Sequence, residues 1–197
     1  MLPDIQPGNT KILYFFNCLL DGMHTTFSYY RSTTFDRDVN LKVDTGGLTC
    51  RDNPYLKDKA PQPWGWAVDP VGLRYTLNVL YDRYHLPLLI VENGVGLDEN
   101  IDEKGEIHDD FRVHYIEEHL KNVNDAIEDG VDCRGYLYWG PIDVVSAGTG
   151  EMKKRYGFVY VDRFNDGHGT LERKLKDSYY RYKEIIESNG EVLLEDE

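Results

Sequence analysis

The sequence predicts an α/β protein made of parallel strand–helix–strand units. Segments with strand patterns alternate along the chain with segments of helical periodicity, and no internal repeat or second-domain signal interrupts them. The middle strand, Leu88–Gly94, is continuously apolar until it reaches Glu92, which is typical of a parallel sheet covered on both faces. The order strand, helix, strand, helix, strand, helix therefore indicates parallel βαβ units.

Composition and charge narrow the class of partner. The 197 residues include 35 Asp and Glu against 22 Lys and Arg, a formal net charge of -13. This balance argues against a nucleic-acid or membrane-surface partner, but it leaves room for a small phosphorylated ligand at a local basic cluster. The three cysteines, Cys18, Cys50 and Cys133, show neither metal-ligand nor disulfide spacing, so we expect a reducing cytoplasm, no metal and no cofactor.

Residues 1–26 form an atypical amino-terminal segment. Ile12–Leu20 is apolar apart from Asn17 and could be read as the core of a signal peptide. Asp4 precedes it, basic residues are nearly absent before it and no small-residue cleavage site follows, so we favour a locally buried segment over secretion. The stretch is also too short to cross a bilayer as a helix.

The next elements are an aromatic strand, a long loop and a helix. Phe27–Tyr30 has a strand pattern, and residues 31–63 are polar enough to form a functional or mobile loop. Asp69-Pro70 predicts a helix start, with aspartate as the cap and proline at the first helical position. This helix ends before Pro87, and its apolar face holds Leu73, Leu77, Leu80 and Tyr84.

A second helix is predicted from Asp109 to Gly130, because apolar and acidic residues alternate there at helical spacing. The tail, residues 191–197, is acidic and is expected to fray. The remaining predicted elements are a strand, a glycine-containing loop, an extended piece and a terminal helix: Arg134–Gly140, 146–154, Gly157–Asp162 and Lys174–Ser188. The terminal helix has an apolar side formed by Tyr179, Tyr182, Ile185 and Ile186.

Glu92 stands at the carboxyl end of the middle strand, where α/β barrels keep their chemistry. Taken alone, a glutamate at this place is more often a salt-bridged structural residue. Three strands are too few to close a barrel, and a full (β/α)₈ barrel needs about 250 residues. The length fits one substantial domain or a part of a larger one.

Six motifs in order resemble glycoside hydrolase family 1, the retaining β-glycosidases. They are Phe27–Tyr30, Trp64-Gly65-Trp66 through Arg74, Leu89–Gly94, Arg112-x-x-Tyr115-x-x-x-His119, Gly135–Trp139 and Lys154–Gly157. The resemblance runs from about Phe27 to Ser188. It implies that residues 27–190 are the carboxyl-terminal part of a (β/α)₈ TIM barrel, holding about strands six to eight with their helices.

The resemblance assigns the nucleophile to Glu92 and its supporting hydrogen-bond donor to Tyr30. A retaining glycosidase uses two carboxylates about 5–5.5 Å apart, and its nucleophile must stay ionised. The family's acid/base lies in an Asn-Glu pair after strand four, and this sequence has no such pair after an apolar strand. Glu99 and Glu191 lie in a loop and the tail, so we expect the isolated chain to lack the acid/base.

The loop after the last strand resembles the 6-phospho-β-glucosidase branch. Ser146 and Ala147 stand where ordinary members have a Glu and a Trp that hold the sugar's outer hydroxyls. Loss of that charge and ring opens room for an anion at the six position. The resemblance implies that Ser146, Lys154 and Tyr156 bind the phosphate, while Gly148 replaces a second serine that the branch often has.

Other residues allow a second interpretation. Residues 153–155 could be an ordinary solvated basic patch. Trp139 is the expected platform under the sugar ring, since an aromatic face suits a pyranose, although core packing fits the same position. We assign Trp64 and Trp66 to packing, and we interpret Arg112 and His119 as structural residues on a helix away from the strand ends.

The predicted function is therefore that of a carboxyl-terminal part of a retaining 6-phospho-β-glucosidase, acting on phosphorylated β-glucosides in the cytoplasm. A complementary half-barrel chain is a candidate partner. The alternatives are a non-catalytic sugar-phosphate-binding remnant and an inert truncated product whose open sheet edges bind other chains. The residues leave open the aglycone, the oligomeric state, and whether the chain is a natural truncation, a frame-disrupted gene or a piece of a longer chain.

Overall fold

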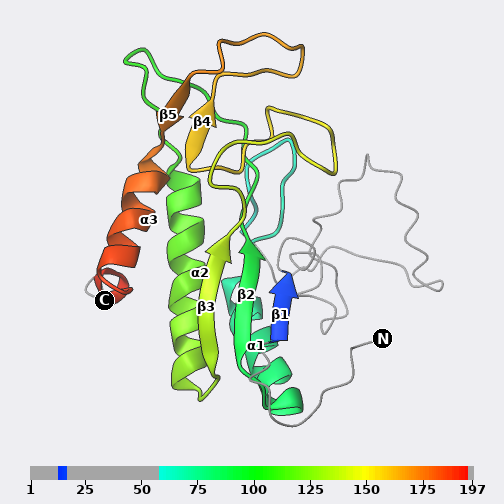
Figure 1. Cartoon of the computed structure of the whole chain (residues 1–197), viewed down its shortest axis with the longest axis vertical. Coiled ribbons are helices and arrows are strands. Elements are labelled where there is room, and N and C mark those ends of the chain that lie inside the picture. The colour runs from blue at the N-terminus through cyan, green and yellow to red at the C-terminus, as the bar shows by residue number, and fades with distance from the viewer. Residues whose placement is uncertain (1–12, 17–57, 195–197) are drawn as a thin grey trace, which may run out of the picture.

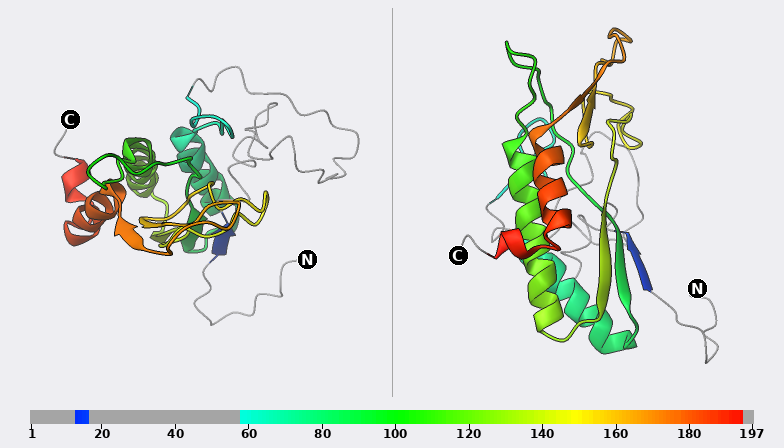
Figure 2. Two further views of the ribbon diagram at one scale, coloured as in Figure 1. Left: turned by 90° about the horizontal axis from the view of Figure 1, so that it is seen from above. Right: turned by 60° about the vertical axis from the view of Figure 1, so that its left-hand side comes forward.

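The computed structural model describes residues 13–16 and 58–194, which form a small parallel sheet backed by helices (Figure 1). The sheet has the order β1 (Leu13–Phe16), β2 (Leu88–Asn93), β3 (Cys133–Tyr138). α1 (Pro70–Tyr84) and α2 (Asp110–Glu128) connect β1 to β2 and β2 to β3 in sequence, and Figure 2 shows them on one side of the sheet. The fold class predicted from sequence is therefore confirmed.

Strand pairing follows the order of the chain, as in a barrel. β2 pairs in parallel with β1 on one side and with β3 on the other. Ile90 stands opposite Tyr136, and Asn93 stands opposite Tyr138. Because consecutive strands are neighbours and a helix joins them, the arrangement is a segment of a (β/α)₈ barrel wall.

Helix α1 begins as its sequence predicts. Asp69 is the cap, and its side chain accepts a hydrogen bond of 2.8 Å from the Gly72 backbone N–H. Leu73 and Leu77 are fully buried against β2 and α2, which confirms most of the predicted face. Tyr84 is 37% exposed, so its assignment to that face is wrong. It occupies the last position of the helix, beyond the edge of the covered sheet.

One of two core clusters lies between the sheet and the two long helices, and the other joins α2 and α3 (Asp177–Glu187) to the loops that follow the strands. Leu88 and Ile90 of β2 are fully buried against α1 and α2, whereas Leu89 and Val91 on the opposite face are only half-buried. Side chains of a strand alternate between its two faces, so the helices cover one of them. The expected coverage of both faces is thus not found within the described residues.

The carboxyl-terminal region corrects two predictions. Residues 173–175 form β5 (Arg173–Leu175), which pairs antiparallel with β4 (Val159–Val161), and helix α3 (Asp177–Glu187) starts three residues later than predicted. The tail is ordered as far as η1 (Glu191–Leu193), because Leu193 is buried in the core. On α3, Ile185 is buried, while Tyr179 and Ile186 are exposed.

A buried chain of charges holds the loops above the sheet together. Its members, here called the charge network, are Asp109, Arg112, Glu99, Lys176, Asp143 and Arg155 in order of contact. Acids and bases alternate along it, so the network is neutral as a whole. The pKa of Lys176 is lowered overall. Burial is the largest cause and repulsion from Arg112 adds to it, and together they outweigh the opposite effect of Glu99 and Asp143.

Arg112 is the most connected member of the charge network. Its guanidinium donates to the backbone carbonyls of Val95 at 2.7 Å, Tyr156 at 2.8 Å and Arg155 at 3.1 Å. It also binds the carboxylates of Glu99 and Asp109. Arg112 is structural, as expected, but it lies against the loops that follow the strands and not away from them. A long side chain on the first turn of α2 is sufficient to reach these loops.

The helices of the described residues include none with the length and hydrophobicity needed to cross a membrane.

We predict that Arg112→Met lowers the free energy of unfolding by about 3–5 kcal/mol, because it strands buried carboxylates without their cation. Arg74→Met is the matched control. Arg74 pairs with Asp125 and Asp129 at the surface, and exposed pairs contribute about 1 kcal/mol or less. Urea denaturation followed by circular dichroism measures both variants. Equal losses would contradict the role assigned to the charge network.

Candidate functional site

Glu92 lies near the carboxyl end of β2, as the sequence predicts. Its side chain is partly buried, and this burial raises the pKa of the carboxyl group. Within the described part of the chain, no hydrogen bond reaches that carboxylate. Tyr30, the residue expected to supply a donor, lies outside the described residues.

The two residues after Glu92 have structural reasons for their identity. Asn93 is fully buried, where its amide donates to the Tyr115 hydroxyl at 3.2 Å and accepts from the Tyr136 hydroxyl. A Cβ at Gly94 would lie 3.1 Å from the Tyr138 ring, so a residue without a side chain lets the backbone pass close to this ring. Asn93 and Gly94 therefore fix the strand end from which Glu92 projects.

Trp139 lies beside this strand end. Its backbone N–H donates to the Asn93 carbonyl at 2.7 Å, which places it directly after β3 and next to the segment that carries Glu92. The residue is 39% exposed, so it is not a core tryptophan. An exposed indole at the end of a barrel strand is compatible with a sugar platform, and this role stays a prediction.

The loop after β2 pairs with the loop predicted to bind phosphate. Leu97 and Arg155 exchange backbone hydrogen bonds of 2.9 Å in both directions. One residue earlier in this pair, a Cβ on Gly96 would lie 2.8 Å from the Lys154 side chain and 3.1 Å from the Tyr156 ring. The segment that follows Glu92 and the segment that contains Lys154 and Tyr156 are thus held against each other by backbone pairing.

Ser146, Lys154 and Tyr156 gather in one place. The Ser146 hydroxyl lies 3.3 Å from the Tyr156 hydroxyl, and Lys154 and Tyr156 both pack against Gly96. All three are buried, and Lys154 is only 3% exposed. The interpretation of residues 153–155 as a solvated patch is therefore wrong for Lys154 and for Arg155, which belongs to the charge network.

Gly148 leaves open space beside this group. A Cβ built there would meet nothing within 4 Å, so the second serine that the sequence lacks would fit sterically. The hydroxyl of Ser146 makes its contact with Tyr156 and also accepts from the Thr149 backbone N–H at 3.4 Å.

The structure adds Trp64 and Trp66, which sequence reasoning assigned to packing alone, to the candidate site. The Lys154 ammonium lies 5.3 Å from the ring centroid of Trp64 and 4.5 Å from that of Trp66. The repeated tryptophan around Gly65 was the available signal. Packing explains a single buried indole, whereas two indoles on one ammonium indicate a more specific arrangement.

One exposed cluster offers metal-binding groups. Asp102, Glu106 and His108 present ligand atoms within 4.8 Å of one another. The Asp102 carboxylate accepts from the backbone N–H groups of Lys104 and Glu106, and His108 bonds to Asp177 at 2.6 Å. These contacts explain the cluster as a surface turn, so we assign no metal to it.

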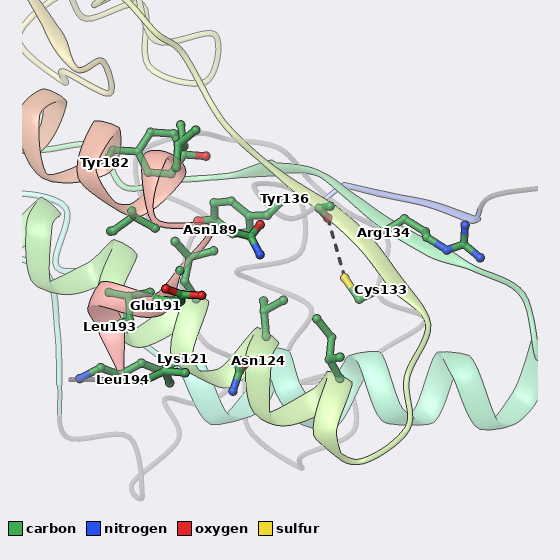
Figure 3. Close-up of a pocket in the computed structure, with 17 residues that line it drawn as sticks. Lys121, Asn124, Cys133, Arg134, Tyr136, Tyr182, Asn189, Glu191, Leu193 and Leu194 are labelled. Atoms are coloured by element: carbon green, nitrogen blue, oxygen red, sulfur yellow. Dashed lines mark hydrogen bonds between the residues drawn. The ribbon is translucent and has the colours of Figure 1, made fainter. Parts of the chain in front are cut away.

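A pocket of about 410 Å³ opens beside β3, between α2 and α3 (Figure 3). It is lined by Tyr136 from the strand, Tyr182 from α3 and apolar residues such as Leu120 and Leu193. In the described residues β3 pairs only with β2, so its other edge is open next to this pocket. A barrel wall would continue at that edge.

The fold and the site define the strand-end region of a (β/α)₈ barrel that carries a glutamate and a loop with a buried lysine. The sequence profile of Glycosyl hydrolase family 1 matches residues 9–191. The chain therefore belongs to glycosyl hydrolase family 1. The match begins at residue 9, whereas the motifs alone placed the start of the resemblance near Phe27.

The match covers most of this chain but only part of the length of its relatives. A 6-phospho-beta-glucosidase of Dickeya chrysanthemi is 51% identical over 170 residues, which are 85% of this chain and 36% of the relative. A phospho-cellobiase of Klebsiella oxytoca is 51% identical over 172 residues, with 86% and 36% covered. This chain thus spans about a third of the length of these relatives and matches their carboxyl-terminal part.

A solved structure agrees with this placement. The beta-glucosidase of Thermotoga maritima in complex with glucoimidazole superposes with a TM-score of 0.61 and 33% sequence identity. The superposition covers 68% of this chain and 29% of that chain. The described fold is accordingly part of a family 1 barrel.

Proposed function

We propose that this chain forms the carboxyl-terminal part of a retaining 6-phospho-β-glucosidase. Glu92 is the nucleophile and Tyr30 supports it, Trp139 carries the sugar ring, and Ser146, Lys154 and Tyr156 bind the 6-phosphate. The observation that carries the proposal is the grouping of these last three side chains against the loop that follows Glu92. Relatives whose names specify phosphorylated glucosides support the same substrate class.

The reaction needs more than the chain supplies. Glu92 can attack the anomeric carbon, but leaving-group protonation requires a second carboxyl group. Glu99 is excluded from that role because Arg112 and Lys176 hold it as a buried carboxylate. We therefore infer that catalysis requires the rest of a barrel, supplied by a complementary half-barrel chain or by a longer form of this chain, which would add strands at the open edge of β3 and supply the acid/base. We also propose that the function is cytoplasmic, because the cysteine spacing fits a reducing compartment.

A complete barrel for testing is a chimaera that joins residues 58–194 to the amino-terminal part of the Dickeya chrysanthemi relative. We predict that Glu92→Gln in this chimaera abolishes formation of a glycosyl-enzyme, because the amide keeps the shape but removes the nucleophilic charge. Mass spectrometry after reaction with a 2-fluoro 6-phospho-glucoside measures the adduct. Glu103→Gln on the exposed loop is the control. An adduct on another residue would refute the assignment.

Lys154→Met is predicted to weaken binding of a 6-phospho-β-glucoside by roughly ten- to a hundredfold, since a hydrogen bond to a charged group contributes about 1.5–3 kcal/mol. Lys153→Met is the matched control, because Lys153 is a partly exposed neighbour paired with Glu151. KM for phosphorylated and plain aryl glucosides is measured on the chimaera. Equal use of both substrates before mutation would defeat the proposed substrate class.

Gly148→Ser is predicted to tighten binding of the same substrate by about two- to tenfold, because the position is open and a new hydroxyl hydrogen bond contributes about 0.5–1.5 kcal/mol. Gly148→Ala adds the Cβ without the hydroxyl and should leave KM unchanged. A gain in the alanine variant would show that the hydroxyl is not the cause.

The chain expressed alone is predicted to have no turnover of an aryl 6-phospho-β-glucoside. It lacks a positioned general acid, a contribution of about 10²–10⁴-fold, and its sheet is open. Co-expression with the amino-terminal part of the relative should restore turnover. Activity of the isolated chain that disappears in Glu92→Gln would contradict this prediction.

A further inference from the structure

The Lys154 side chain is enclosed by aromatic rings. It is 3% exposed, and its ammonium lies within cation–π range of both Trp64 and Trp66. Gly96 packs against the aliphatic stem, since a Cβ there would lie 2.8 Å from the Lys154 Cγ. Backbone and aromatic groups thus surround this side chain.

The two indoles belong to a short hairpin, in which residues 58–60 pair with residues 66–68. The Ala60 N–H donates to the Trp66 carbonyl at 2.6 Å, and the Val68 N–H donates to the Asp58 carbonyl at 2.9 Å. Gly65 between the tryptophans has φ +57, a conformation that L side chains rarely adopt. This glycine allows two adjacent large rings to reach a single group.

Contacts around the rings fix their places further. The Trp64 Nε1 donates to the Glu151 carboxylate at 3.4 Å, which joins the hairpin to the loop that contains Ser146. The Trp66 ring lies 6.1 Å from the Tyr156 ring. The hairpin and the expected phosphate residues therefore form one packed unit.

We propose that Trp64 and Trp66 form an aromatic clamp that positions the Lys154 ammonium for a 6-phosphate and so determine the preference for phosphorylated sugars. The inference rests on the proposed function of Lys154. An aromatic face attracts a cation through its quadrupole, and the two indoles add no formal negative charge next to the ammonium. A preordered lysine also loses less side-chain freedom when that ligand binds.

The first experiment is a double-mutant cycle on the full chain, with Trp66→Leu, Lys154→Met and the double variant in urea denaturation. The clamp predicts a coupling that multiplies the folding equilibrium constant by about three- to thirtyfold. The corresponding cycle of Trp64 with the partly exposed Lys153, whose Nζ lies 5.7 Å from the Trp64 ring, should show a smaller coupling. No coupling between Trp66 and Lys154 would overturn the clamp without touching the proposed function.

The second experiment titrates the full chain with glucose 6-phosphate and with glucose by calorimetry. Trp64→Leu and Trp66→Leu should each weaken glucose 6-phosphate binding by about three- to thirtyfold, while Trp66→Phe, which retains an aromatic face, should lose less. Unchanged affinity in both leucine variants, together with loss in Lys154→Met, would overturn the clamp and leave the phosphate site standing. Failure of the unmodified chain to prefer glucose 6-phosphate would overturn the clamp, whereas the proposed function is tested separately by the KM values of the chimaera.

Discussion

The charge network is the constraint on which the region above the sheet depends. β2 ends at Asn93 and β3 at Tyr138, and in the loops beyond them only the short β4–β5 pair and isolated bridges satisfy backbone groups by strand pairing. Arginine side chains satisfy further backbone carbonyls. Arg112 donates to the Val95 carbonyl, while Arg155 donates to the carbonyls of Val161 at 2.8 Å and Arg163 at 3.0 Å. The carboxylates that neutralise these arginines bind further loop groups, so a single neutral network orders the irregular part of the fold.

Much of the fold could be predicted from local sequence patterns. The Asp69-Pro70 start of α1, the apolar run of β2 and the acidic start of α2 are signals carried by neighbouring residues, and each led to the right element. The failures came where distant contacts decide. Lys174 to Lys176 continue the helical pattern of α3, yet β4 pairs with that stretch and Lys176 is drawn into the core.

The candidate site shows the same division. Glu92 was recognisable at the end of an apolar strand, and the spacing of Lys154 and Tyr156 was visible in the sequence. The partners that hold them were not, because Glu99 and Lys176 are 77 residues apart and Arg112 and Tyr156 are 44 apart. Residues 153–155 also read as a surface patch, since a run of basic residues gives no indication that aromatic rings and carboxylates will enclose it.

The proposed substrate gives this long-range architecture a mechanistic consequence. The phosphate on C6 and the reacting carbon C1 are separate points on the sugar, so phosphate binding can help catalysis only if both points are held on one rigid frame. Here the guanidinium of Arg112 donates both to the carbonyl of Val95, which follows Glu92 in the chain, and to the carbonyl of Tyr156, which lies in the loop expected to bind phosphate. The Leu97–Arg155 backbone pair joins these two segments a second time. Under the proposed function, phosphate binding at Lys154 would therefore orient the anomeric carbon toward Glu92 through this frame of described residues.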